Sequence, residues 1–521
     1  MRADLSTTIQ MRKSNSIWSV LPIVPVDLVV LFIVIANAIF ISYRLFLPYP
    51  VNPWEAGIVT DAWRMLQGDP IYAIGTDHAT TVYGPLTTAV LALAFEFTGP
   101  TLELGRFMSA ISGTAVVILL AAIFGNRDRL TFAVAVALLL AADSRTGYYF
   151  TETRPDMTYI FSTILALIVL YHSLESTKAA PRAVLTAAGC GLLMIAAMFK
   201  QTALAFVFVP MLAVLPQYGK MYFRKQLVFA AIPIAAGLVT VGAVWYLAPG
   251  LWYFMFEVVG QYKIPILRTG RIAIELVTSV PLFWLAMLHW LYTDARNDWR
   301  SPRIRWLMAA MACAIPTSLA GAARDGGAPN SLIPALLCIG AFCAWRAPVA
   351  IELLRDDKQP FSLRAVTGIL LSVLLFAHAY PVPGALSSDA FKGDGVADRS
   401  KVIAETRLLP GKVVCPDDPT IPLMAKGYAG RTALFEADPV YWDPSRSQAV
   451  EKEIQSADYV IAMRHGLMPS GKALVTAEVG WGTGDNVLIA AGFTKSRFRT
   501  ISSPVYELWR RTRDKADDNL Q

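Results

Sequence analysis

The sequence predicts a polytopic α-helical membrane protein that carries a small α/β domain at its C-terminal end. Hydrophobic residues make up 55% of the 521 residues and charged residues only 16%, and the mean hydropathy is +0.47. Apolar runs of about 18–20 residues, each long enough to cross a bilayer, recur along the chain. Beyond residue 383 no such run remains, and charged residues, Gly and Pro become more frequent. We therefore expect a transmembrane domain over residues 1–383 and a soluble domain over residues 384–521.

The first apolar run, about Leu28–Leu47, follows a short basic segment with Arg2, Arg12 and Lys13. No small-residue cleavage site follows the run, which indicates an uncleaved signal-anchor. Because basic residues stay on the cytoplasmic side, the N-terminus is expected inside and the loop 48–103 outside.

Basic residues also decide the number of spans. Pro85–Thr98 is apolar but only about 14 residues long, which suits an interfacial or re-entrant helix. If it does not cross, about eleven spans result and the basic loops fall on the cytoplasmic side. If it crosses, twelve spans place nearly all these loops outside, so we prefer eleven. The expected spans are about Leu28–Leu47, Leu104–Gly125, Leu130–Ala142 with a few further residues, Met157–His172, Ala183–Met198, Thr202–Leu215, Leu227–Ala248, Ile272–Tyr292, Ile304–Gly321, Ser331–Trp345 and Ala365–Tyr380.

The C-terminal region combines short β-like runs with helical stretches. The runs 412–415 (KVVC) and 458–463 (DYVIAM) are typical of strands, and a helical stretch lies near Ser447–Ser456. An odd number of spans places this small α/β domain outside.

The outer loop after the first span is unusually polar. Residues 52–85 include Glu55, Asp61, Asp77 and His78, and a long ordered loop between spans usually has a function. Glu55 could deprotonate an acceptor or, with Asp156, hold a divalent cation. The alternative is an ordinary solvated loop acid.

A second acid follows in the segment 151–159 (TETRPDMTY). Asp156 falls at the outer end of a span, where ionisable groups are usually functional or paired. An ion pair with Arg145 or Arg154 is the alternative to catalysis or metal binding.

Lys200 and Gln201 lie between two short apolar runs, where a helical hairpin would turn on the outer side. Lys200 could face a lipid-linked phosphate, and Arg324 could assist it. Snorkelling of the lysine to the membrane surface is the alternative.

These motifs, in this order, resemble the lipid-dependent glycosyltransferases of the GT-C fold. The resemblance covers about the first 350 residues. Within that fold, the sequence most resembles the bacterial family that includes aminoarabinose transferase and the protein O-mannosyltransferases. The motifs are Trp54–Ala56, Ala62–Tyr72, His78–Leu86, Arg106, Arg154–Asp156, Lys200–Thr202 and Gly326–Asn330.

The resemblance implies a GT-C-like fold and a transferase with a polyprenyl-phosphate sugar donor. Glu55 and Asp156 would carry the family's two acids. Relatives often have an Asp-Glu pair where this chain has Trp54 before Glu55. If the family's base is that Asp, either Glu55 or Asp61 would have to take its place here. The residues expected to bind substrate are His78, Tyr83, Arg154, Lys200, Gln201, Arg324 and Asn330.

We therefore expect a glycosyltransferase of the bacterial inner membrane that acts on the periplasmic side, where the C-terminal domain also lies. Its partners would be the lipid-linked donor, a cell-envelope glycan, lipid or protein acceptor, and membrane lipids. Nucleic acid is not expected, because the basic residues concentrate in short loops. The sequence identifies no cofactor; a divalent cation is an open alternative, and Glu55 and Asp156 would be its ligands. The alternatives are a transporter or flippase for lipid-linked saccharides, a polysaccharide polymerase or ligase, and a non-catalytic assembly scaffold.

Overall fold

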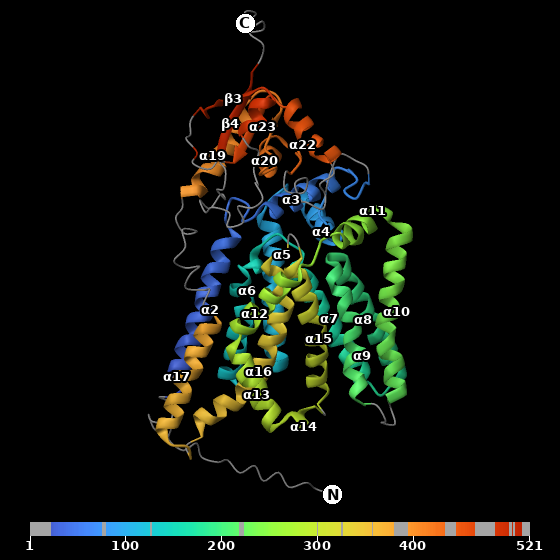
Figure 1. Ribbon diagram of the computed structural model, residues 1–521, viewed down its shortest axis with the longest axis vertical. Helices are drawn as coiled ribbons and strands as arrows, with labels where there is room; N and C mark the ends of the chain where they lie inside the picture. Colours follow the sequence, from blue (N-terminus) through green and yellow to red (C-terminus); the bar gives the residue numbers. More distant parts are fainter. Residues whose placement is uncertain are drawn as a thin grey trace, which may run out of the picture.

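The protein is a helical bundle with a small α/β domain at one end, as the computed structural model in Figure 1 shows. The structure describes residues 22–74, 80–125, 128–217, 223–299, 301–324, 327–356, 358–379, 394–432, 444–463, 485–499, 503 and 506–512. Of the expected site residues, His78 lies outside these ranges.

Eight helices in the described ranges are long and apolar enough to cross a membrane. A ninth span results if α12 (Ile266–Ser279) and α13 (Pro281–Thr293), which meet at 76°, are counted together. The eight are α2 (Val24–Leu45), α5 (Glu103–Phe124), α7 (Asp156–Glu175), α8 (Ala179–Phe199), α10 (Phe223–Leu247), α15 (Pro302–Ala323), η5 with α16 (Pro329–Leu332 and Ile333–Arg355) and α17 (Phe361–His378).

Two further expected spans are helical but less suited to lipid. The helix α6 (Arg129–Thr146) contains three charged residues, Arg129, Asp143 and Arg145, and packs against α16 inside the bundle. The run Gln201–Gln217 is a short apolar segment made of η2 (Gln201–Phe208), α9 (Val209–Val214) and η3 (Leu215–Gln217). Each expected span thus corresponds to a helical segment, but only eight or nine meet the length and composition of a membrane span.

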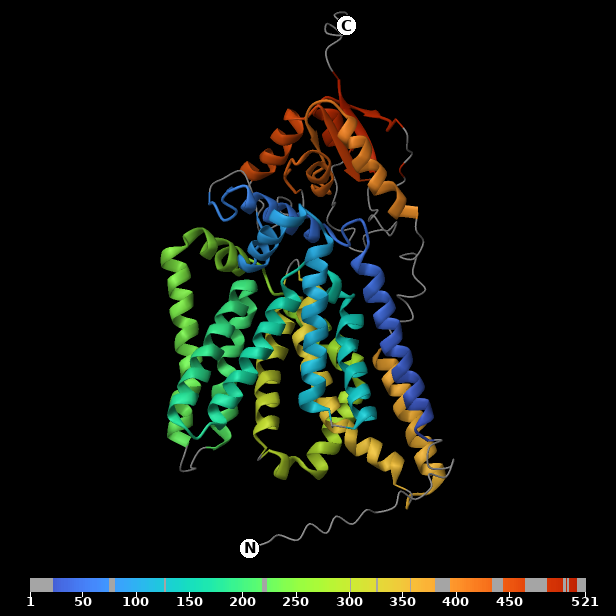
Figure 2. The ribbon, with the colours of Figure 1, turned by 180° about the vertical axis from the view of Figure 1, so that it is seen from behind.

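Two short helices cover the end of the bundle beneath the α/β domain. The helix α3 (Pro53–Leu66) begins at Asn52, whose side-chain oxygen accepts a hydrogen bond from the main-chain N–H of Glu55. The helix α4 (Leu86–Thr98) packs against α3. Figures 1 and 2 show both between the bundle and the domain, so the segment 86–98 lies at the bundle end, as expected for a helix that does not cross.

Short helices complete the two bundle ends. Near the α/β domain lie η1 (Tyr149–Thr151), α11 (Pro249–Trp252) and the π-helix η4 (Tyr253–Val258), and at the opposite end lies α14 (Ala295–Asp298).

The C-terminal domain contains a four-stranded sheet of order β1-β2-β4-β3. The strands are β1 (Val413–Val414), β2 (Tyr459–Met463), β3 (Phe493–Ser496) and β4 (Tyr506–Arg511). β1 and β2 are parallel and the other two pairs are antiparallel. The helices are α19 (Asp394–Leu408), α20 (Thr420–Lys426), α22 (Pro444–Ser456) and α23 (Asp485–Ala490).

Both faces of this sheet are buried. Ile461 packs in a cluster with Val402 of α19 and Ile421 of α20, whereas its neighbour Val460 packs with Ile454 of α22 and Leu488 of α23. Successive residues of a strand point to opposite faces, so helices cover the sheet on both sides. This explains why the run 458–463 is apolar without a polar alternation.

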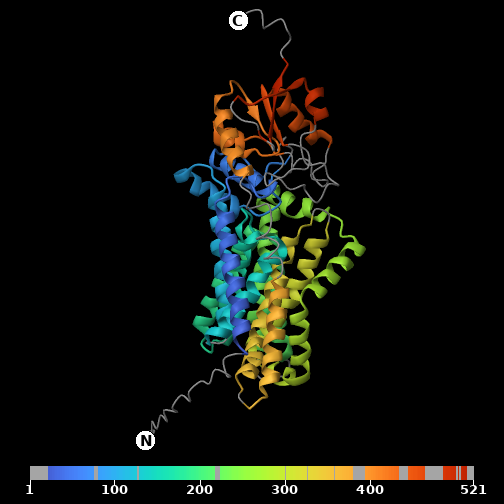
Figure 3. The ribbon, with the colours of Figure 1, turned by 90° about the vertical axis from the view of Figure 1, so that its left-hand side faces the viewer.

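The α/β domain is attached to the bundle end by specific contacts. Leu423 of α20 joins the apolar cluster of Ile58 and Leu91 from α3 and α4. The buried Arg399 pairs with Asp418 at 2.9 Å and also donates a hydrogen bond to the main-chain oxygen of Pro48. Figure 3 shows the domain stacked on this end of the bundle from the side.

A substitution at Gly84 tests how closely the loop before α4 approaches the bundle. A Cβ at this position would collide with the main-chain oxygen of Met198, near the end of α8, and backbone cannot move aside as a flexible side chain can. We expect Gly84→Ala to destabilise the protein by about 1–3 kcal/mol, measured by thermal unfolding in detergent.

Gly191→Ala is the matched control, because a Cβ there has no atom within 4 Å and alanine favours a helix interior. Equal unfolding temperatures for the two variants would contradict the close approach at Gly84.

Candidate active site

Glu55 is buried at the junction of α3, α5 and the loop before α7. Its side chain is 0% exposed and pairs with Arg106 of α5 at 2.8 Å. The two carboxylate oxygens also accept hydrogen bonds from the main-chain N–H groups of Val51, at 2.6 Å, and Thr153, at 2.8 Å. Burial raises the pKa of Glu55, but the Arg106 guanidinium and these hydrogen bonds hold it below its ordinary value.

This environment changes the role expected for Glu55. Its carboxylate connects three segments and is fully buried, with the Arg106 guanidinium and two main-chain N–H groups around it, which leaves no open side toward an acceptor hydroxyl in this arrangement. Glu55 is therefore better described as the centre of a buried ion pair than as the catalytic base. The hypothesis that it is an ordinary solvated loop acid is also wrong, because the side chain is fully buried.

Asp61 has a structural environment as well. It is 1% exposed and accepts hydrogen bonds from the Thr80 hydroxyl at 2.6 Å and the Thr81 main-chain N–H at 3.2 Å. These bonds fix the start of the loop 80–85 against α3. Asp61 is thus also poorly placed to replace Glu55 as a base.

Asp156 is the centre of a buried polar cluster at the first turn of α7. One oxygen, Oδ1, accepts hydrogen bonds from the Lys200 ammonium at 2.7 Å and from the Asn330 amide at 3.0 Å. The other, Oδ2, lies 3.6 Å from Nε of Arg154. The expected ion pair with Arg154 is present, whereas Arg145 instead donates to the main-chain oxygens of Ala377 and His378.

Tyr83 links the two cations of this cluster. Its hydroxyl accepts a hydrogen bond from Arg154 at 3.0 Å, and the Lys200 ammonium lies 5.1 Å from the centre of its ring. Burial raises the pKa of Tyr83, but Arg154 and Lys200 outweigh it, so the pKa is lower than the ordinary value. The tyrosine oxygen thus lies in a positive electrostatic environment.

A small recess of about 20 Å³ lies beside this cluster. Three cations line it: Arg154, Lys200 and Arg324. Arg324 lies 4.9 Å above the ring of Tyr262, and its Nε is buried without a hydrogen-bond partner among the described residues. The full lining is Trp54, Val82, Tyr83, Arg154, Lys200, Tyr262, Arg324, Ala328, Asn330 and Ser331.

Gln201 supports the recess from behind. Its amide donates hydrogen bonds to the main-chain oxygens of Val82 at 3.2 Å and Met255 at 2.9 Å. It therefore positions the loop that carries Tyr83 and is not among the residues that line the recess. Of the substrate-binding residues predicted within the described ranges, Tyr83, Arg154, Lys200, Arg324 and Asn330 line it together.

Sequence reasoning missed Glu152 and Arg44. Glu152 is 4% exposed and pairs with Arg44 of α2 at 3.1 Å, and it lies 3.9 Å from Arg154. Burial, the largest effect, raises the pKa of Glu152 to about 7, although Arg44 and Arg154 lower it. The signal available was a second acid two residues before Arg154, but its partner lies 108 positions away in sequence.

The arrangement does not suit a divalent cation held by Glu55 and Asp156. Each carboxylate is already paired with positively charged side chains, which occupy the positions that ligand oxygens would offer a metal. In the part of the chain that the structure describes, no group of three or more His, Cys, Asp or Glu side chains could hold a metal ion.

No protein-family model and no curated protein sequence matches the chain. Solved structures do match it in fold. ArnT from Cupriavidus metallidurans has a TM-score of 0.54 without ligand and 0.53 bound to undecaprenyl phosphate. The identities are 16% and 15%, and each comparison covers 93% of this chain and at least 97% of the other.

An archaeal structure shares the fold over part of its length. The oligosaccharyltransferase of Archaeoglobus fulgidus has a TM-score of 0.51 and 10% identity, over 83% of this chain and 69% of its own. The chain therefore has the GT-C fold, as the resemblance in sequence predicted. At these identities the likeness establishes the fold alone.

The Glu55–Arg106 pair predicts a large effect on stability. Arg106→Gln should destabilise the protein by about 3–5 kcal/mol, because it leaves the Glu55 carboxylate buried without its cation. Glu55→Gln combined with Arg106→Gln should recover part of this loss, since neither charge then remains. Thermal unfolding of the single and double variants in detergent measures the difference. If the double variant loses as much stability as the two single variants together, or more, the result would contradict the pairing.

Glu152 predicts a pH dependence of stability. Its pKa is about 7 in the folded protein and about 4.3 when unfolded, so the folded state binds the proton more tightly. The resulting stabilisation is complete below about pH 4 and is lost as the pH rises through 7. The unfolding temperature of the wild type should therefore fall between pH 6 and 8 more steeply than that of Glu152→Gln. Parallel pH profiles of the two proteins would contradict the raised pKa.

Proposed function

We propose that the protein is an integral membrane glycosyltransferase that transfers a sugar from a polyprenyl-phosphate-linked donor to a cell-envelope acceptor. The observation that carries this proposal is the recess with three cations at one end of a GT-C-fold bundle. It is supported by the structural likeness to ArnT, whose structure was determined with undecaprenyl phosphate. The acceptor is a glycan, lipid or protein of the envelope.

The donor phosphate would bind in the recess. Lys200 and Arg154 are partly neutralised by Asp156, whereas Arg324 forms no ion pair among the described residues. The recess therefore keeps positive charge for an anion. When the bond between the anomeric carbon and phosphate breaks, negative charge grows on the phosphate oxygens, and fixed cations in a buried site stabilise it strongly.

Asp156 is itself buried and does not line the recess, but its contacts with residues that do line it make it our candidate to accept the proton of the acceptor hydroxyl. It contacts three residues that line the recess, and its Oδ2 has no hydrogen bond among the described groups. Asp156 also holds Lys200 toward the phosphate site. In this mechanism it takes the role expected for Glu55, while Glu55 keeps α3 in place.

The site is proposed to face the periplasm of a bacterial inner membrane. At the bundle end opposite the α/β domain, basic residues gather at the ends of helices, as expected for a cytoplasmic face. They include Arg129, Lys178, Arg182, Arg224, Lys225, Arg303, Arg355, Lys358 and Arg364. The recess and the α/β domain would then both be periplasmic and the N-terminus cytoplasmic.

A transporter or flippase for lipid-linked saccharides, a polysaccharide polymerase or ligase, and an assembly scaffold are the other candidates. A cationic recess could bind a lipid phosphate in each of them. An assay of sugar transfer by the purified protein in detergent distinguishes the enzymes from a transporter or a scaffold, because only an enzyme transfers sugar without a bilayer.

The phosphate site is tested with polyprenyl-phosphate sugars in detergent. Lys200→Gln and Arg324→Gln should each lower kcat by about 10²–10³-fold, because each removes charge that stabilises the leaving phosphate. Transfer is measured as radiolabelled sugar that moves from the lipid to acceptor material in membrane extracts.

Lys178→Gln is the control, because Lys178 is exposed at the opposite end of the bundle. Undiminished transfer by Lys200→Gln and Arg324→Gln would contradict the phosphate site. No transfer by the wild type with any such donor, together with saccharide transport in liposomes, would favour the transporter.

A further inference from the structure

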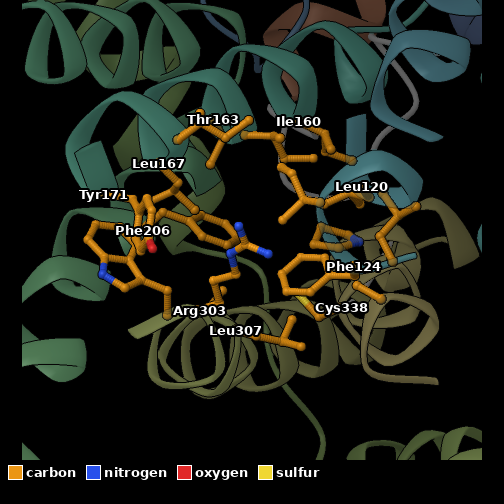
Figure 4. A pocket seen from close by; sticks show the side chains of 18 of the residues that line it. Leu120, Phe124, Ile160, Thr163, Leu167, Tyr171, Phe206, Arg303, Leu307 and Cys338 are labelled. Carbon is orange, nitrogen blue, oxygen red and sulfur yellow. The ribbon is translucent and has the colours of Figure 1, made fainter. Parts of the chain in front are cut away.

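A second cavity, of about 300 Å³, lies within the bundle. Figure 4 shows its lining, in which α5, α7, α15 and α16 take part. The walls are mostly aliphatic and aromatic side chains, and no carboxylate is among the described residues that line it. Such a volume and lining are typical of a site for an apolar ligand.

The cavity is closed near the candidate active site. There it is lined by the buried residues Tyr159, Ile160 and Pro334. The Tyr159 ring lies 5.6 Å from the Lys200 ammonium, so this residue separates the cavity from the polar cluster. A lipid tail that descends from the recess therefore meets a closed wall.

The cavity opens at the other end of the bundle. Its exposed lining residues are Ala122, His172 and Arg303, which lie near the end of α5, near the end of α7 and at the start of α15. From Tyr159 to His172 the α7 axis rises about 20 Å, at about 1.5 Å per residue. The depth thus matches about one leaflet of a bilayer.

Arg303 places a positive charge in this opening. Figure 4 shows its side chain reaching into the cavity from α15. In the part of the chain that the structure describes, its guanidinium forms no hydrogen bond and no ion pair. An anionic lipid has a negatively charged phosphate and apolar acyl chains. The Arg303 guanidinium can bind the phosphate, and the apolar cavity beside it can hold an acyl chain.

We infer that this cavity binds one anionic phospholipid from the leaflet opposite the α/β domain. Its phosphodiester pairs with Arg303, and one acyl chain enters the cavity toward Tyr159. The inference is independent of the proposed transferase activity, since it rests on a different opening at the other end of the bundle. The tail of the lipid carrier fits less well, because the wall beside the recess is closed and the charge lies at the far end.

The experiment measures lipid retention by the purified full-length protein. The protein in a neutral detergent is mixed with phosphatidylglycerol or phosphatidylcholine of the same acyl chains, and bound lipid is counted by native mass spectrometry. The wild type should retain one phosphatidylglycerol and much less phosphatidylcholine. Arg303→Gln should lower the affinity for phosphatidylglycerol about tenfold, the effect of one lost charge-assisted contact.

Two variants make the result specific. Arg129→Gln removes an exposed arginine from the start of α6 at the same end of the bundle and should retain the lipid as the wild type does. Ala310→Phe fills the cavity about two turns along α15 from Arg303 and should lower retention with the charge in place. Equal retention of both lipids, or equal retention by the wild type and Arg303→Gln, would overturn the inference. So would a stronger binding of a neutral polyprenol than of phosphatidylglycerol, which would assign the cavity to the carrier tail.

Discussion

The structure depends on the ion pair that Glu55 and Arg106 form in the buried end of the bundle. Glu55 and Arg106 are each inaccessible to solvent, and their ion pair joins α3 to α5. Through the N–H of Thr153, the same carboxylate also holds the loop before α7. A buried ion pair adds little net stability, but a missing partner is costly. The pair therefore fixes how these three segments pack together. Two of them carry residues of the recess, Trp54 on α3 and Arg154 in the loop before α7.

The fold could be predicted because its signals are local. Long apolar runs predicted the bundle, and the short strands at 413–414 and 459–463 were recognised within about one residue. It was harder to predict which helical segments meet the length and composition of a membrane span. α6 carries Asp143 and Arg145 near its end because their partners, the N–H of Phe150 and the main-chain oxygens of Ala377 and His378, lie inside the protein. No sequence window shows where those partners are.

The candidate site could be predicted in part. Tyr83, Arg154, Lys200, Arg324 and Asn330 were expected together and line one recess. The roles of the acids were not predictable, because they depend on burial and on distant partners. Glu55 has the sequence context of a catalytic acid, yet Arg106, 51 positions away, pairs with it. Glu152 was overlooked because its partner Arg44 belongs to the first span.

The charge balance of the recess argues for a ligand and against a purely structural cluster. A cluster that served stability alone would match each buried cation with an acid, as Glu55 matches Arg106. Around the recess, Asp156 instead pairs with both Lys200 and Arg154, while Glu152, 3.9 Å from Arg154, already pairs with Arg44. Arg324 lies over the ring of Tyr262 and has no ion pair in the part of the chain that the structure describes. Leaving such a charge uncompensated costs stability, and proteins commonly accept that cost at sites where function requires it. The same uncompensated positive charge that lowers the stability of the free protein would attract an anion, such as a lipid-linked phosphate, that neutralises it.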